Sequence, residues 1–166
     1  MSQLPLPMTP AHCLQHVVVP ALALLGAARY DSPDARVMLL AIAGQESGLA
    51  HRRQVKGPAR GLWQFEQGGG VRGVLNHSSS RSAAAALCNA QGVSATPAAV
   101  YAQLQHDDIL AAGFARLLLY TLPIRLPAIG DVSAAWAQYL DAWRPGQPHS
   151  DRWPACYLRA VKAVKA

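Results

Sequence analysis

Apolar residues recur at helical spacing along most of the chain. From Val37 to Gly44 they stand three or four positions apart, which predicts a helix over 33–46. Ser32, followed by a proline, is a start signal for this helix, and Gly48 is a stop signal. Comparable signals predict further helices over 10–28, 71–77, 80–92, 97–105, 107–120, 131–144 and 154–164.

The segment 49–73 does not follow the helical pattern. Together with Gly48 it holds seven glycines, which is typical of loops and short strands. Residues 62–65, Leu-Trp-Gln-Phe, alternate and are partly aromatic, which predicts a short strand. The glycine run at 68–70 is short and isolated, which favours a flexible turn over a phosphate-binding loop.

The chain has the features of one globular domain. Residues 1–9 predict an extended lead-in, and no linker divides the rest, so we expect a single domain over 1–166. Hydrophobic residues make up 51% and charged residues 14%, which argues against disorder. The apolar run from Val17 to Ala28 is too short to span a bilayer and favours a core helix, with a membrane tether as the alternative. No basic residue precedes Thr9, so no secretory signal is expected.

The net charge of the chain and its possible metal ligands limit the kinds of partner that we expect. A net charge of +6, from 15 Lys+Arg and 9 Asp+Glu, favours an anionic partner such as nucleic acid, a membrane surface or an acidic wall polymer. Nucleic acid is not expected, because the predicted helices are rich in alanine and poor in arginine. The three cysteines are widely spaced, and His12 and His16 have no third ligand nearby. We expect a monomer without disulfides, metal or cofactor.

Glu46 is the residue that points most directly to chemistry. It is one of only two glutamates, and it stands at the end of the apolar run 36–45. Burial disfavours a charged carboxylate, and the negative end of the helix dipole acts in the same direction, so the pKa of Glu46 is expected to rise. A carboxylic acid that keeps its proton near neutral pH can donate that proton to a leaving group.

The residues around Glu46 carry a family resemblance. Glu46-Ser47 is followed by the run from Gly57 to Gln64, Gly-Pro-Ala-Arg-Gly-Leu-Trp-Gln. This resembles the active-site signature of the lysozyme-like superfamily, in its lytic transglycosylase and goose-type lysozyme branch, where Glu-Ser precedes Gly-Ala-x-Gly-Leu-Met-Gln. The resemblance implies a mostly α, lysozyme-like fold of about seven or eight helices, with a small β-hairpin region after the catalytic helix. It also implies cleavage of the MurNAc-GlcNAc bond of peptidoglycan glycan strands.

Each matched position takes a role from this resemblance. Glu46 becomes the general acid, and Ser47 becomes the neighbour that orients it or the sugar. Gly61 permits a close backbone approach behind the site, and Gln64 lines the cleft to bind the N-acetyl sugar or to steady the acid. The remaining matched positions, Leu62 and Trp63, are expected at the substrate wall. For Trp63, which replaces the usual methionine, stacking on a sugar and packing in the core are both open.

Glu66 is a candidate second carboxylate. It follows Gln64 by two positions, where goose-type lysozymes have an aspartate. Hydrolytic glycosidases use two carboxyl groups, whereas lytic transglycosylases use one glutamate and form a 1,6-anhydro sugar. A catalytic role for Glu66 would therefore distinguish a muramidase from a lytic transglycosylase. The alternative is that Glu66 is a solvated residue with no catalytic role.

One family motif, Ala-Tyr-Asn-x-Gly, is missing. The nearest stretch runs from Ala134 to Tyr139, so Trp136 or Tyr139 is the candidate to stand beside Glu46. The helical spacing of Trp136, Leu140 and Trp143 also fits plain core packing for two of these three residues.

The segment 136–148 is similar to bacteriophage proteins that pair Gln-Glu-Ser-Gly with Gly-Pro-Ala-x-Gly-Leu-x-Gln. With no signal peptide, this similarity implies an endolysin that stays in the host cytoplasm until holin-type release, or a wall-degrading part of the phage virion. A non-catalytic virion structural protein that retains a lysozyme-like fold is the alternative.

Overall fold

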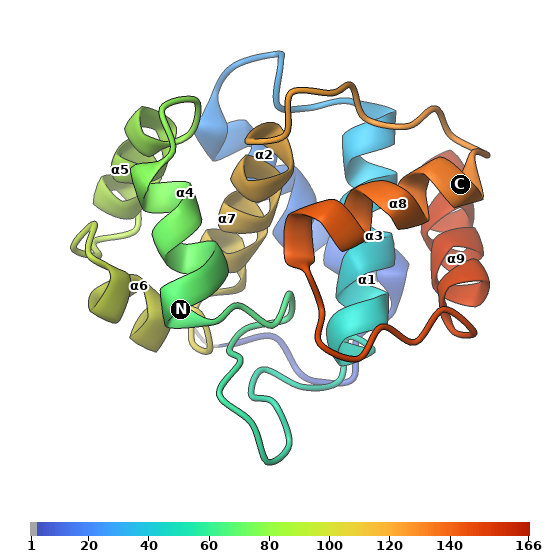
Figure 1. Cartoon of the computed structure of the whole chain (residues 1–166), viewed down its shortest axis with the longest axis horizontal. Helices are drawn as coiled ribbons and strands as arrows, with labels where there is room; N and C mark the ends of the chain where they lie inside the picture. Colours follow the sequence, from blue (N-terminus) through green and yellow to red (C-terminus); the bar gives the residue numbers. More distant parts are fainter. Residues whose placement is uncertain (1–2) are drawn as a thin grey trace.

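The structure, a computed structural model that describes residues 3–166, is mostly α, as the sequence predicts (Figure 1). α4, α5 and α6 gather on one side, α1, α3, α8 and α9 on the other, and α7 passes between them. One hydrophobic core extends from Met8 to Ala160. The helices are α1 (Pro10–Cys13), α2 (Val19–Leu25), α3 (Pro33–Ser47), α4 (Arg72–Asn76), α5 (Arg81–Ala90), α6 (Pro97–Gln103), α7 (Asp108–Tyr120), α8 (Val132–Trp143) and α9 (Trp153–Lys165), with π-helical turns η1 (Leu14–Val18) and η2 (Gln67–Val71).

The first predicted helix is a continuous run of α1, η1 and α2. Thr9 caps it by accepting a hydrogen bond from the His12 amide. The π-helical turn lies just before Pro20, which has no N–H to donate into the helix. The run ends at Gly26, in the left-handed conformation with φ 76°, rather than at the predicted residue 28.

α3 is the central helix and is buried on nearly every side. Ser32 caps its first turn, and Gly48 ends it with φ 63°. Every residue from Val37 to Ala43 is buried, and α9 packs along the helix. The end of α3 is thereby held inside the protein, which determines where Glu46 stands.

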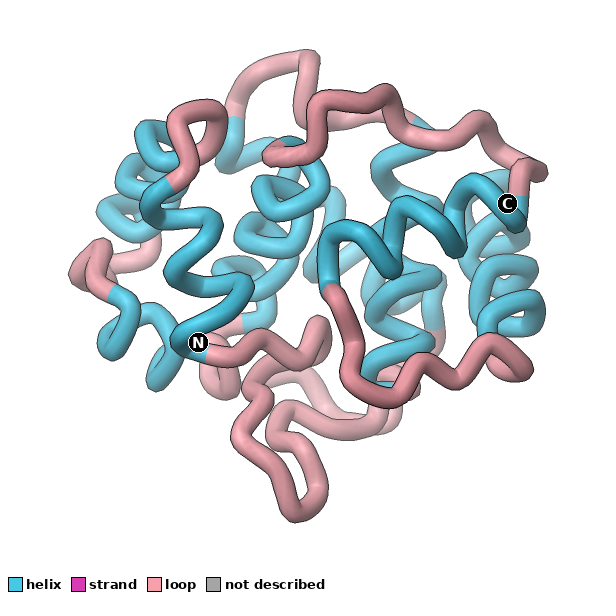
Figure 2. Tube along the Cα trace, in the orientation of Figure 1, coloured by secondary structure: helices cyan, strands magenta, loops and turns pink. Residues whose placement is uncertain are grey.

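The predicted strand at 62–65 and the small β-hairpin are both wrong. Among the residues that the structure describes, this region forms only isolated antiparallel bridges, Arg53 with Arg60 and Arg60 with Phe65, and Figure 2 shows it as loop. Gly61 (φ 79°) and Gln64 (φ 52°) are both left-handed, so the chain turns back within four residues. Leu62, Trp63 and Phe65 are apolar because this turn buries them, and they do not mark the alternating faces of a strand.

Two further local predictions need correction. The glycine run at 68–70 is part of the π-helical turn η2, which leads into α4, instead of a separate flexible turn. Ser80, at the start of the helix predicted over 80–92, makes no capping bond with its side chain: it is fully buried and donates its hydroxyl to the Val74 carbonyl oxygen at 2.7 Å. Asp131, by contrast, does cap α8. Within residues 3–166, no helix is long and apolar enough to cross a membrane.

Candidate active site

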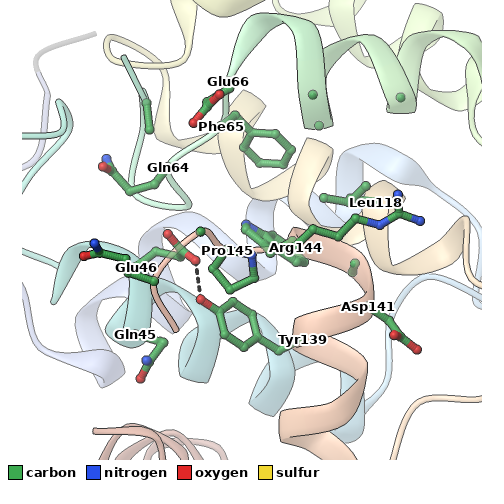
Figure 3. Close-up of a pocket in the computed structure, with 18 of the residues that line it drawn as sticks. Gln45, Glu46, Gln64, Phe65, Glu66, Leu118, Tyr139, Asp141, Arg144 and Pro145 are labelled. Atoms are coloured by element: carbon green, nitrogen blue, oxygen red, sulfur yellow. Dashed lines mark hydrogen bonds between the residues drawn. The ribbon is translucent and has the colours of Figure 1, made fainter. Parts of the chain in front are cut away.

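A cleft of about 860 Å³ opens at the C-terminal end of α3 (Figure 3). It is lined by the ends of α3, α7 and α8, by the turn 64–66, and by glycines of η2 and α4. The segment 144–149, which comes after α8, closes one side. Its lining includes Gln45, Glu46, Gln64, Glu66, Leu118, Tyr139, Asp141, Trp143, Arg144, His149 and Arg152.

Glu46 lies in the last turn of α3 and lines this cleft. Burial raises the pKa of its carboxyl group from the ordinary value of 4.5 to about 7, although a hydrogen bond from Tyr139 and the charge of Arg152 both lower it. The expected rise in the pKa of Glu46 is therefore confirmed, with burial as its largest cause. Glu46 therefore keeps its proton to a higher pH than an exposed glutamate does.

Tyr139 is the side chain that contacts Glu46. Its hydroxyl donates a hydrogen bond to Glu46 Oε1 at 2.5 Å, and Figure 3 shows the two groups facing each other. Burial and the neighbouring Glu46 carboxyl raise the pKa of Tyr139, so it remains a donor over the physiological pH range. The ring stacks on Trp153 with centroids 5.3 Å apart and an interplanar angle of 9°, which fixes its position.

Trp136 does not reach the cleft. It packs against Tyr139 and Trp153, with ring centroids 5.3 and 5.5 Å apart, and so supports the tyrosine from behind. Of the two candidates in this stretch, the structure brings Tyr139 to Glu46 and leaves Trp136 in the packing around it. Placing Trp136 at the substrate surface was wrong.

Gln64 and Gly61 have the positions expected of them. Gln64 lines the cleft, and its left-handed backbone is held by a hydrogen bond from its own Nε2 to the Gly61 carbonyl oxygen at 2.8 Å. A methyl group on Gly61 would lie 3.0 Å from the Leu104 carbonyl oxygen and 3.4 Å from Ala111 Cβ. Gly61 is thus needed for both the backbone angle and the close approach of the neighbouring segments.

Three residues assigned to substrate binding lie in the interior. Leu62 and Trp63 are fully buried, and the Trp63 indole donates to the Leu39 carbonyl oxygen at 2.9 Å, so Trp63 packs in the core and does not stack on a sugar. Ser47 is also buried and donates to the Ala43 carbonyl oxygen. The expectation that Leu62 lies at the substrate wall is wrong, and of the two alternatives for Trp63 core packing is confirmed, because the motif's turn points its apolar residues inward and its ends, Glu46 and Gln64, toward the cleft. The expected contact of Ser47 with the sugar is wrong because Ser47 is buried, and its role in orienting Glu46 stays a prediction.

Glu66 lines the cleft as an exposed residue. It directly precedes η2, and Figure 3 shows it on the opposite side of the opening from Tyr139. A second exposed carboxyl group, that of Asp141 on α8, also lines the cleft. Glu46 is therefore the only one of the three carboxyl groups that is substantially buried.

Several cleft residues are not identified by the sequence motifs. Arg152 is one, although its charge acts directly on Glu46. Gln45 is another: it is buried, and its Nε2 donates to the His149 carbonyl oxygen at 2.9 Å, which ties the segment after α8 to α3. Trp143 donates its indole N–H to the Trp63 carbonyl oxygen at 2.9 Å. Only Gln45 had a signal in the sequence, because it adjoins Glu46.

No cluster of three metal-ligating side chains occurs in the part of the chain that the structure describes. His12 and His16 stand with ring centroids 4.4 Å apart, away from the cleft lining. The three cysteines carry free thiols. The cleft itself offers carboxyl and phenol groups, which can take part in acid–base chemistry, and amide and guanidinium groups, which can donate hydrogen bonds to a substrate.

Comparisons of this chain with models of known protein families, with curated proteins and with solved structures gave no match. The candidate site thus stands on its own geometry: a partly buried acid with a pKa near 7, held by a buried tyrosine at one end of an open cleft.

Proposed function

We propose that the protein cleaves the glycosidic bond between MurNAc and GlcNAc in peptidoglycan, with Glu46 as general acid. The observation that carries the proposal is the environment of Glu46, whose pKa is raised to about 7 at the wall of a cleft. An acid with a pKa near the working pH combines an available proton with useful acidity. The cleft is open and polar, as a chain-like sugar substrate requires.

Tyr139 determines which oxygen of Glu46 delivers the proton. Because the tyrosine hydroxyl donates to Oε1, that oxygen is occupied as an acceptor. The proton of the neutral carboxyl group is then best placed on Oε2, from which it can pass to the glycosidic oxygen of the substrate. As the bond breaks, Glu46 becomes a carboxylate, and the same hydrogen bond stabilises the new charge.

The fate of the sugar depends on the second proton transfer. If the resulting Glu46 carboxylate removes a proton from the sugar's own hydroxymethyl group, the product is a 1,6-anhydro sugar. If a water molecule is activated instead, the product is a reducing end, and Glu66 is the carboxyl group that we assign to position this water. The exposure of Glu66 and the burial of Glu46 favour Glu46 as the single essential acid.

We further propose that the chain is a divergent member of the lysozyme-like superfamily and acts on the bacterial cell wall. Its mostly α fold and the position of Glu46 at the end of α3 support this, together with the Gly61–Gln64 turn beside the cleft. The phage resemblance favours release as an endolysin or delivery as part of the virion.

The test is mass spectrometry of the soluble products after purified peptidoglycan is incubated with the wild type, Glu46→Gln and Asp141→Asn. The second variant removes an exposed carboxyl group from the same cleft and serves as the matched control. We expect muropeptides from the wild type and Asp141→Asn, and a loss of roughly 10²-fold or more in Glu46→Gln. Full activity of Glu46→Gln would refute the role of this acid. The absence of products from every protein would favour a non-catalytic wall-binding protein.

A further inference from the structure

A second hollow, of about 530 Å³, lies on the far side of the segment that comes after α7. The loop between α2 and α3 and the segment 122–126 form its two rims, and these two stretches run beside each other along one edge of the molecule (Figure 1). Leu122 lines both this hollow and the cleft. The two hollows are therefore neighbours that share one side chain.

The lining of the second hollow is strongly basic. Three arginines line it, Arg29, Arg116 and Arg125, and no aspartate or glutamate does. The nearby Asp31 pairs with Arg36 at 2.8 Å. The charge of Asp31 also reaches Arg116, but the Asp31 carboxylate is bound by both guanidinium contacts of Arg36, and none of the three lining arginines forms an ion pair with a carboxylate within residues 3–166.

Arg116 is the unusual member of this set. It is only 4% exposed, although it carries a full positive charge. Its guanidinium group donates to two backbone carbonyl oxygens, from Nε to Tyr30 at 2.7 Å and from one terminal nitrogen to Arg29 at 3.1 Å. These hydrogen bonds go only to neutral carbonyl groups, and burial lowers the pKa of Arg116 although the charge of Asp31 acts in the opposite direction.

The neighbours of Arg116 hold the guanidinium group in place without neutralising it. Its central carbon lies 5.6 Å from the ring centroid of Tyr120 and 6.0 Å from that of Tyr30. Such contacts favour a cation and restrict its orientation, but they add no negative charge. A guanidinium group has five N–H donors, of which two are engaged here.

We infer that this hollow is a binding site for a small oxyanion, a carboxylate or phosphate group, with Arg116 as its floor and Arg29 and Arg125 as its rim. A planar guanidinium group pairs with either anion through two parallel hydrogen bonds. Both rim arginines are exposed, so they can close on the anion without disturbing the core. The inference is independent of glycosidic cleavage, because it concerns a hollow that contains neither Glu46 nor Tyr139.

Titration of inorganic phosphate and of acetate, monitored by NMR of the backbone amides, tests the site. Sodium chloride at matched ionic strength serves as the reference, because it reports non-specific screening. We expect saturable shifts that concentrate at residues 29–32 and 119–126. The probe that binds more tightly identifies the ligand as carboxylate-bearing or phosphate-bearing.

Two double variants make the test specific. Arg29→Gln with Arg125→Gln removes both rim charges and is expected to weaken binding at least tenfold, because each lost charge-assisted hydrogen bond accounts for about that factor. Arg159→Gln with Lys162→Gln removes the same net charge from exposed positions of α9 and should bind as the wild type does. Shifts that match those in chloride, or equal weakening in both double variants, would overturn the inference.

Discussion

Replacing Glu46 by Gln is expected to stabilise the protein at alkaline pH, and it removes the proton that we propose for catalysis. The folded-state pKa of this carboxyl group is about 7, against an ordinary value of 4.5 that represents the unfolded chain. Between these two pH values the unfolded chain has lost a proton that the folded protein still holds. Stability therefore falls as pH rises through this range and levels off above the folded pKa.

The magnitude comes from the same two values. The difference between 4.5 and about 7 corresponds to about 3 kcal/mol of unfolding free energy, since one pH unit equals about 1.4 kcal/mol. Glutamine has the shape of the protonated acid and can still accept the hydrogen bond from Tyr139. We thus expect Glu46→Gln to match the wild type near pH 4 and to exceed it by about 3 kcal/mol near pH 8.

Urea unfolding monitored by tryptophan fluorescence at both pH values measures this difference. Because all other titrating groups are common to the two proteins, their contributions cancel in the comparison. Glu66→Gln is the matched control, since it replaces an exposed carboxyl group of the same cleft and should show no gain at alkaline pH. A Glu46→Gln variant with the same relative stability at both pH values would refute the buried-acid argument.

Two further substitutions test the residues that position the candidate site. Tyr139→Phe removes a hydrogen bond that favours the Glu46 carboxylate, so the pKa of Glu46 should rise further. The pH profile of lysis should then extend to higher pH, and the maximal rate of lysis should fall about tenfold. Gly61→Ala adds a methyl group 3.0 Å from the Leu104 carbonyl oxygen at φ 79°, and thermal unfolding should show a loss of about 2 kcal/mol or more. Gly92→Ala, at φ 68° with nothing within 4 Å, should lose less; equal losses would contradict the close-approach argument.

Local signals in the sequence determined most helix boundaries. Thr9, Ser32, Asp107 and Asp131 each cap a helix through a side-chain oxygen that accepts from an amide three residues ahead. Such bonds depend on neighbours along the chain, so they can be predicted without tertiary structure. The rise in the pKa of Glu46 was predictable for a related reason, because an apolar helix carries its end into the core.

Tertiary packing decided what surrounds Glu46. Tyr139 stands 93 positions away, and nothing local distinguished it from Trp136 on the same helix. The burial of Trp63 likewise depends on a hydrogen bond to the distant Leu39 carbonyl oxygen, and the left-handed turn that replaced the predicted strand brings Gly61 against Leu104. Hydrophobic periodicity reports that a residue is buried but not which residue it meets, because many pairings bury the same area. The sequence alone therefore pointed to Glu46 as the candidate acid, and only the folded chain selected its partner and the walls of its cleft.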